Sequence, residues 1–302
     1  MHDQAWERAL ELVSEMRGRG VQCNVHSYTA LMNVCIKCGR LTQAREAFQL
    51  LLADGCAPNV VTYNSLIDCL GKMGAWEEAV AVLDTMRAEG VEPVLRTYNT
   101  LIIACNFCAK PREAMAVHRR MLEEGLHPNS TTFNALISAY GKAGELDKVM
   151  EVFAAMVSNG CERSVITYSS LMAACESHWE LALELFREMV CAAAVVGGGE
   201  GPRQLASNLA PLSIPNSPSL TTRPPAQNVE GISPNTVTFN SLLTALAAGA
   251  QWEKASEMFE QMQRQGCRPD VVTYTSLISG LEKGGQWRLA LRVRGQREAL
   301  FP

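Results

Sequence analysis

A period of 35 residues runs through this chain and constrains its fold more than any other feature. Repeats begin at Val25, Val60, Leu95, Ser130, Val165, Thr236 and Val271, and successive starts are 35 residues apart except between the fifth and the sixth. Three residues after each start comes an aromatic: Tyr28, Tyr63, Tyr98, Phe133, Tyr168, Phe239 and Tyr274. Self-similarity at such a period indicates a stack of small structural units and not one central core.

Within each repeat the apolar residues follow a helical period. In the second repeat, two groups keep the spacing i, i+3, i+4, i+7: Tyr63, Leu66, Ile67 and Leu70, then Trp76, Ala79, Val80 and Leu83. Gly71 and Gly74 are predicted to lie between the two helices, while Gly90 and Pro93 close the repeat. One helical hairpin cannot bury both apolar stripes, so neighbouring hairpins must stack. We expect an all-α fold, an α-solenoid of stacked helix-turn-helix hairpins that forms a right-handed superhelix.

The repeats divide the chain into four segments. Residues 1–24 are the second half of a truncated repeat, and 25–191 hold repeats 1 to 5. Residues 192–229 carry six prolines and no helical period, which predicts a disordered insertion within repeat 5 or a retained intron in the gene model. Residues 230–302 give the end of repeat 5, repeat 6 and a truncated repeat 7. Any transit peptide would have to precede Met1.

Composition excludes some classes of protein. Hydrophobic residues make up 47% and charged residues 19% of the chain, with a formal charge of −4. This charge argues against nucleic-acid binding through bulk electrostatics, although a local stripe of lysines remains compatible with it. The 11 cysteines occur without a secretory signal, so reduced, buried thiols are expected. No apolar run reaches membrane-spanning length, which predicts no membrane partner.

Two CxxC pairs, Cys35/Cys38 and Cys105/Cys108, and a His-x-Glu at His178 suggest a zinc site. Both pairs occupy the same place near the end of a first helix, two repeats apart, so stacked hairpins hold them too far apart to share a metal. No phosphate-binding loop, nucleophile elbow or paired carboxylates stand out. We therefore expect no metal, no cofactor and no catalytic residue.

Aromatic residues in a shared register most simply build the stack. The tryptophans precede the alanine of a second helix by three residues: Trp6, Trp76, Trp179, Trp252 and Trp287. We expect these residues and the Tyr/Phe column to pack between repeats, with base stacking as the alternative.

The residue after each aromatic is small and polar, in a first helical turn where better helix formers were available. This first-turn column consists of Thr29, Asn64, Asn99, Asn134, Ser169, Asn240 and Thr275. One explanation is local hydrogen bonding to the backbone. The other is recognition of base edges, because amides and hydroxyls present different donors and acceptors.

The last residue of each repeat behaves similarly. This closing column consists of Asn24, which precedes repeat 1, and then Asn59, Val94, Asn129, Ser164, Asn235 and Asp270. Helix capping alone explains six of the seven, and a capping residue can also read a base. A third column, toward the end of the first helix, holds Lys37, Lys72, Lys142 and Lys283. These lysines can follow a phosphate backbone or simply favour the helix dipole.

At these columns the chain resembles the pentatricopeptide repeat family in its pure 35-residue form. The segments Val61-Thr62-Tyr63-Asn64-Ser65-Leu66-Ile67 and Gly266-Cys267-Arg268-Pro269-Asp270 carry the resemblance, which covers residues 1–191 and 230–302. It implies binding of single-stranded RNA, with one base per repeat read by the first-turn residue together with the closing residue. We call these two residues the reading pair.

Carried over repeat by repeat, the resemblance implies a base for each reading pair. Thr29 with Asn59 implies A, Asn64 with Val94 a weak pyrimidine, Asn99 with Asn129 a pyrimidine, Asn134 with Ser164 C, Ser169 with Asn235 A, Asn240 with Asp270 U, and the unpartnered Thr275 a purine. The expected RNA core is A-Y-Y-C-A-U-R, read 5′ to 3′.

The resemblance also implies a role in chloroplasts or mitochondria, where such proteins stabilise, process or help translate a transcript, in some cases with other RNA-processing proteins. Two alternatives stay open. One is a protein-binding helical scaffold, which the acidic charge favours. The other is the RNA-recognition part of a nuclease or editing enzyme whose catalytic domain lies outside this sequence.

Overall fold

The computed structural model describes residues 5–197 and 233–300, and these residues form α-helices and no strand. The first helices of the repeats are α2 (Val25–Lys37), α4 (Val60–Lys72), α6 (Leu95–Phe107), α8 (Ser130–Lys142), α10 (Val165–Ala174), α13 (Thr236–Ala248) and α15 (Val271–Lys283). The second helices are α1 (Ala5–Gly18), α3 (Leu41–Ala53), α5 (Trp76–Ala88), α7 (Pro111–Glu123), α9 (Leu146–Ser158), α11 (Trp179–Gly197), α14 (Trp252–Arg264) and α16 (Trp287–Leu300). The predicted all-α fold of helical hairpins is confirmed.

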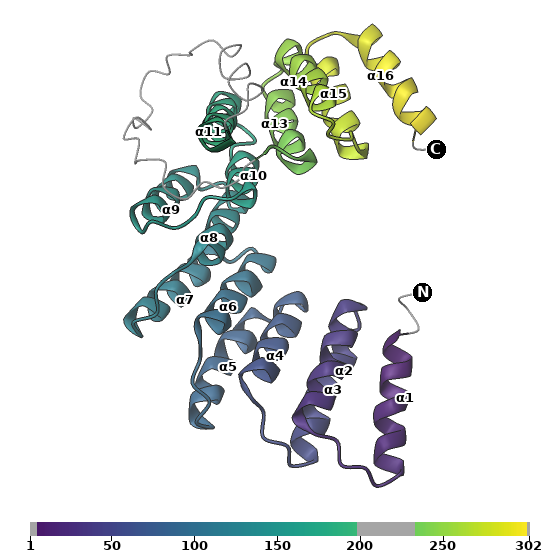
Figure 1. Cartoon of the computed structure of the whole chain (residues 1–302), viewed down its shortest axis with the longest axis vertical. Coiled ribbons are helices and arrows are strands. Elements are labelled where there is room, and N and C mark those ends of the chain that lie inside the picture. Colours follow the sequence, from purple (N-terminus) through teal and green to yellow (C-terminus); the bar gives the residue numbers. More distant parts are fainter. Residues whose placement is uncertain (1–4, 198–232, 301–302) are drawn as a thin grey trace. The chain divides into compact units, whose positions relative to one another are not determined.

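The chain forms two compact parts, residues 1–139 and 140–302, and each is described by itself. Within each part the first helices of successive repeats pack on one another, as α2 does on α4 and α4 on α6, and likewise α13 on α15. Second helices such as α3, α5 and α14 contact the first helix of their own repeat and that of the next, as α14 does with α13 and α15 (Figure 1). The apolar stripes are therefore buried between repeats, as the period predicts.

Glycines at the end of the first helices have two different roles. Gly74 adopts a left-handed φ of 82° just after α4, a conformation that glycine takes without a steric penalty. Gly71 was expected in the same turn, but it lies inside α4 and is buried. A Cβ added to Gly71 would come within 2.4 Å of the Ala104 Cβ in α6. The prediction for Gly71 was wrong because close helix packing requires glycine as often as a turn does.

The aromatic column forms the centre of each junction. Its seven members have between 0 and 5% of their surface exposed. The Tyr63 hydroxyl donates a hydrogen bond to the Glu89 carboxylate at 2.5 Å, which satisfies the one polar group of a buried ring. The expected packing role of this column is confirmed.

Tryptophans at the start of the second helices pack at the edges of the junctions. The Lys110 ammonium lies 5.6 Å from the centre of the Trp76 ring, one repeat further on. The Trp179 ring lies against Gly249 of the next repeat, where an added Cβ would stand 2.2 Å from Cδ1. Trp287 is different, since it is 60% exposed. Contacts between repeats thus account for the tryptophans of the inner repeats.

Repeat 5 departs from the regular pattern. Its first helix α10 ends at Ala174, and α11 continues to Gly197, past the expected start of the insertion at Ala192. Alanines and the absence of proline before Pro202 explain the longer helix. The remaining insertion residues, 198–229, lie outside the described residues. Helix α13 packs on α10 and α11, so the stacking of first helices resumes there. None of the described helices has the length and apolarity that crossing a membrane requires.

Candidate nucleic-acid interface

The first-turn column lies at the junction between neighbouring first helices and is mostly buried. Five of its members have 7 to 9% of their surface exposed: Thr29, Asn64, Asn99, Ser169 and Asn240. Asn134 is half-buried, and Thr275, in the last described first helix, is exposed. Polar side chains at such a junction need hydrogen-bond partners there. These partners decide which donor or acceptor each residue has left for a ligand.

The closing column caps the first helices. Asn24, Asn59, Asn129, Ser164, Asn235 and Asp270 each accept a hydrogen bond from the backbone N–H of the third helical residue. Val94 has no side-chain cap bond. The capping interpretation therefore holds for the six residues that the sequence indicates.

The third residue of the first helix is a threonine in six repeats, and we call it the N3 threonine. These residues are Thr62, Thr97, Thr132, Thr167, Thr238 and Thr273, each with none of its surface exposed. In five of these repeats the closing residue's backbone N–H donates to the hydroxyl, as Asp270 does to Thr273 at 3.0 Å. This column was not predicted from the sequence, because the threonine never varies among these repeats and falls inside an apolar helical pattern.

Two reading pairs are in direct contact. The Asn99 amide Nδ2 donates to the Asn129 Oδ1 at 3.2 Å. The Asn240 Nδ2 donates to both carboxylate oxygens of Asp270, at 3.0 and 3.1 Å. The two columns, 30 residues apart in sequence, thus form one polar unit in space in these repeats.

Two further pairs are joined through the N3 threonine. The Thr62 hydroxyl lies 2.9 Å from the Thr29 hydroxyl and 3.0 Å from the Asn59 Oδ1. In the C-terminal part, the Thr238 hydroxyl lies 3.2 Å from the Ser169 hydroxyl and 3.0 Å from the Asn235 Oδ1. Thr29 also donates to its own helix at the Val25 carbonyl, 2.7 Å away. For this residue, backbone bonding and contact with the closing residue's network coexist.

The remaining pairs differ. Asn64 and Val94 form no such unit, since valine offers no polar atom and the buried Asn64 Oδ1 has no hydrogen-bond partner. Asn134 and Ser164 belong to different compact parts, so their mutual geometry is not described. Thr275 donates to the Val271 carbonyl at 2.7 Å.

Hydrogen bonds hold Asp270 in its anionic form. Burial by itself would raise the pKa of this carboxyl group. Donors from the Thr273 backbone and hydroxyl and from the Asn240 amide outweigh the burial and lower the pKa. At neutral pH the pair therefore presents a carboxylate beside an amide.

An exposed stripe runs along each first helix beside the reading pairs, and it starts at the second helical residue. This N2 column consists of His26, Val61, Arg96, Thr131, Ile166, Val237 and Val272, all exposed. Val61, Ile166, Val237 and Val272 have 52, 66, 59 and 54% of their surface exposed. This column was not predicted from the sequence because its residues vary between polar and apolar types, so the position shows no single pattern. Exposed apolar side chains at one repeated position indicate a contact surface.

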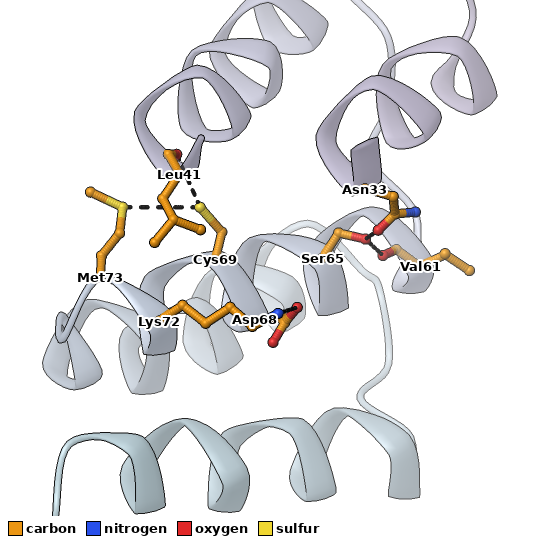
Figure 2. A network of polar contacts seen from close by, with 8 residues as sticks. All are labelled: Asn33, Leu41, Val61, Ser65, Asp68, Cys69, Lys72 and Met73. Atoms are coloured by element: carbon orange, nitrogen blue, oxygen red, sulfur yellow. Dashed lines mark hydrogen bonds and ion pairs between the residues drawn. The ribbon is translucent and has the colours of Figure 1, made fainter. Parts of the chain in front are cut away.

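The lysine column lies on the same stripe. Eleven residues separate Val61 from Lys72, which is about three helical turns, so both side chains emerge on one side of α4. Figure 2 shows Val61 and Lys72 on α4, with the buried Ser65 between them directed toward Asn33 of α2 at 3.1 Å and Lys72 paired with Asp68 at 2.8 Å. Lys37, Lys142 and Lys283 are exposed at the equivalent position. A phosphate that contacts Lys72 would have to share its ammonium group with Asp68. The negative charge of the Asp68 carboxylate also weakens the attraction of this place for anions.

The cysteines belong to the packing. Cys35, Cys69, Cys105 and Cys175 are buried, and the Cys69 thiol donates to the Leu41 carbonyl at 3.2 Å (Figure 2). Burial raises the pKa of Cys69 to about 11 and that of Cys105 to about 12. In the part of the chain that the structure describes, no three residues of the metal-binding types gather.

Comparisons with known proteins agree on one family. Residues 2–157, just over half of the chain, match a family model described as the pentacotripeptide-repeat region of PRORP. Residues 234–283 match the PPR repeat family, and residues 272–296 match the PPR repeat. A search of curated protein sequences finds no match.

Two solved structures resemble the chain over most of its length. One is the pentatricopeptide repeat protein PPR10 in complex with an 18-nt psaJ RNA element, with 22% identity and a TM-score of 0.54. The match covers 97% of this chain and 56% of that one. The other is PPR10 from maize, with 25% identity, a TM-score of 0.51, and coverage of 94% and 45%. The chain thus spans about half the length of these proteins.

Proposed function

Because this chain belongs to the pentatricopeptide repeat family, we propose that its first helices bind single-stranded RNA and that each reading pair recognises one base. The observation that carries the proposal is the direct contact between Asn240 and Asp270. One residue of the first-turn column and one of the closing column are in contact, so that an amide lies beside a carboxylate. Such a combination presents a defined set of donors and acceptors to the edge of a base.

The exposed stripe beside the pairs suits the rest of a nucleotide. The apolar N2 residues, such as Val61 and Val237, offer surface to the flat faces of bases on either side. Stacking and apolar contact of this kind is tolerant of sequence, so it supplies affinity while the reading pairs supply selectivity. Lys37, Lys142 and Lys283 then lie on the stripe where phosphates can be contacted.

The expected target follows from the pairs in chain order. The RNA core is A-Y-Y-C-A-U-R, in which the second base is weakly selected because Val94 cannot contribute a hydrogen bond. The fourth and fifth positions depend on Asn134 with Ser164 and on Ser169 with Asn235.

The proposed biological role is the stabilisation, processing or translation of a transcript in chloroplasts or mitochondria. A bound solenoid acts by occupying RNA, which blocks nucleases or alters RNA structure, and we assign no chemical step to these repeats. Other RNA-processing proteins are the expected partners. PPR10 in its RNA complex supports the proposal through shared fold.

The test is selection from a randomised RNA pool at several salt concentrations, with the wild-type chain and with Asn240→Thr. The wild type should enrich the predicted core. The variant keeps Asp270 and should change the preferred base from U to G at the sixth position only, since a hydroxyl replaces the amide beside the carboxylate. Absence of RNA binding, or a loss of preference spread evenly over all positions, would refute the proposal.

A further inference from the structure

We propose that in four repeats the N3 threonine of the following repeat is a positioning residue that fixes the orientation of the preceding first-turn side chain and thereby its base preference. This inference rests on the proposed function and adds a third residue to these four reading pairs. Thr273 serves Asn240, Thr132 serves Asn99, Thr62 serves Thr29 and Thr238 serves Ser169.

The single hydroxyl proton of Thr273 has two acceptors within reach and lies closer to one of them. The Asp270 backbone N–H donates to the Thr273 oxygen at 3.0 Å, which occupies a lone pair. The hydroxyl proton is then shared between two acceptors, the Asn240 Oδ1 at 2.6 Å and the Asp270 Oδ1 at 2.9 Å. The shorter contact indicates that the proton is directed mainly to Asn240. Thr132 repeats this geometry, at 2.6 Å from the Asn99 Oδ1.

The amide of Asn240 is therefore held from two sides. Its oxygen accepts from Thr273, and its nitrogen donates to Asp270. A rotation of the amide by half a turn would place the NH₂ against the hydroxyl and the oxygen against a carboxylate. That arrangement loses the bond from the amide to Asp270 and the short bond from Thr273, and it adds repulsion between the amide oxygen and the carboxylate. A base that meets the pair thus meets one arrangement of donor and acceptor.

The N3 threonine also determines which hydrogen-bonding group of a first-turn hydroxyl is left for a ligand. Thr29 donates its only hydroxyl proton to the Val25 carbonyl at 2.7 Å, so the Thr62 hydroxyl is the donor in their 2.9 Å contact. Thr29 is left with an acceptor lone pair for a ligand. An acceptor at this place suits the exocyclic amine of adenine, the base expected for the first repeat.

Repeat 2 provides a natural contrast. Its closing residue is Val94, and although Thr97 still receives the Val94 N–H at 3.3 Å, the Asn64 Oδ1 has no partner. Asn64 is as buried as Asn99, with 7% of its surface exposed. Fixing the amide therefore needs the oxygen of a closing residue beside the threonine as well as the threonine itself.

The first test needs no RNA. Hydrogen exchange of side-chain amides, followed by nuclear magnetic resonance on the wild-type chain, should be at least about tenfold slower for Asn240 and Asn99 than for Asn64. Equal rates for the three amides would overturn the inference even if RNA binding is found. If the chain binds no RNA, the proposed function fails, while comparison of the Asn240 amide exchange rate in the wild type and in Thr273→Val still decides whether the threonine fixes the amide. Equal rates in these two chains would overturn the inference.

The second test uses Thr273→Val, which keeps the shape of the side chain and removes the hydroxyl. The preference for U at the sixth position should fall about tenfold, while Thr273→Ser should retain it. Thr97→Val is the matched control and should leave the second position unchanged. Thermal unfolding checks that each variant is folded. A folded Thr273→Val chain with its full preference for U would overturn the inference.

Discussion

The junction between α4 and α6 and the junction between α13 and α15 are built alike for packing and differently for polar contacts. In both, a glycine in one first helix lies against an alanine in the other, Gly71 against Ala104 and Gly280 against Ala247. The first approach is tighter, since an added Cβ would stand 2.4 Å from the nearest atom, against 3.3 Å in the second. The polar side differs because the residue before α6 is Val94, which makes no side-chain cap bond, whereas Asp270 caps α15.

This difference separates two tasks of a repeat. Stacking depends on small and apolar residues, and it persists at Val94, where the polar pair is lost. In the proposed function, base recognition depends on the closing residue, because of these two junctions only the one with Asp270 gives its asparagine hydrogen bonds on both the amide nitrogen and the amide oxygen. A repeat can therefore keep its place in the stack after losing its reading function.

The largest expected effect comes from breaking the tighter packing. Gly71→Ala should lower the free energy of unfolding by about 2–3 kcal/mol, because the new methyl group would overlap Ala104 and the helices would have to separate. Gly280→Ala should cost less than about 1 kcal/mol, since its contacts need to yield by only a few tenths of an ångström. Urea denaturation measures both values.

Gly295 in α16 supplies the control for this comparison, because an added Cβ meets nothing within 4 Å. Gly295→Ala should raise stability by up to about 1 kcal/mol through helix propensity alone. If Gly71→Ala changed the free energy of unfolding as Gly295→Ala does, the inference of close packing between α4 and α6 would be wrong.

The architecture could be predicted well from the sequence because each residue pattern recurs in several repeats. A single Tyr63 or Ala79 says little, but the same residue type at the same place in successive repeats fixes the helices and their buried faces. The role of Gly71 was not predicted correctly. The residues at the same position in the adjacent repeats differ in type, and a glycine near the end of a helix is expected equally for a turn and for a close helix contact.

An intermediate effect is expected from exchanging the closing residues. Asp270→Val should destabilise the chain by about 1–2 kcal/mol, because α15 loses its cap and Asn240 its partner. Val94→Asp should stabilise it by up to about 1 kcal/mol by capping α6. Thermal or urea unfolding of the two single variants checks the opposite signs, and the same sign for both would contradict the account.

The smallest effect concerns pH. Because the pKa of Asp270 is lower in the folded chain than its value of about 3.9 in an unfolded chain, its contribution to stability is present above that value. The contribution is lost as the pH falls through the folded pKa. The stability difference between the wild type and Asp270→Asn should therefore be constant from pH 7 to about pH 5 and shrink in stronger acid. Urea denaturation across this range measures it, and a difference that grows in acid would contradict the assignment.

The candidate site was only partly predictable. The first-turn and closing columns stood out because polarity persisted while identity varied. Their burial and contact depend on how neighbouring first helices cross, which one sequence does not specify. Thr273 and its equivalents went unnoticed for the opposite reason, since a residue that does not vary within an apolar pattern resembles ordinary helix. The pairing of Lys72 with Asp68 likewise required coordinates.

The most direct test of recognition by reading pairs is RNA selection with Val94→Asp beside the wild type. The change gives Asn64 the same partner that Asn240 has, and it alters no residue of the other pairs. The account predicts that the second position changes from a weak pyrimidine preference to a strong preference for U, with every other position unchanged. An unchanged second position, or an altered preference at positions read by other repeats, would contradict it.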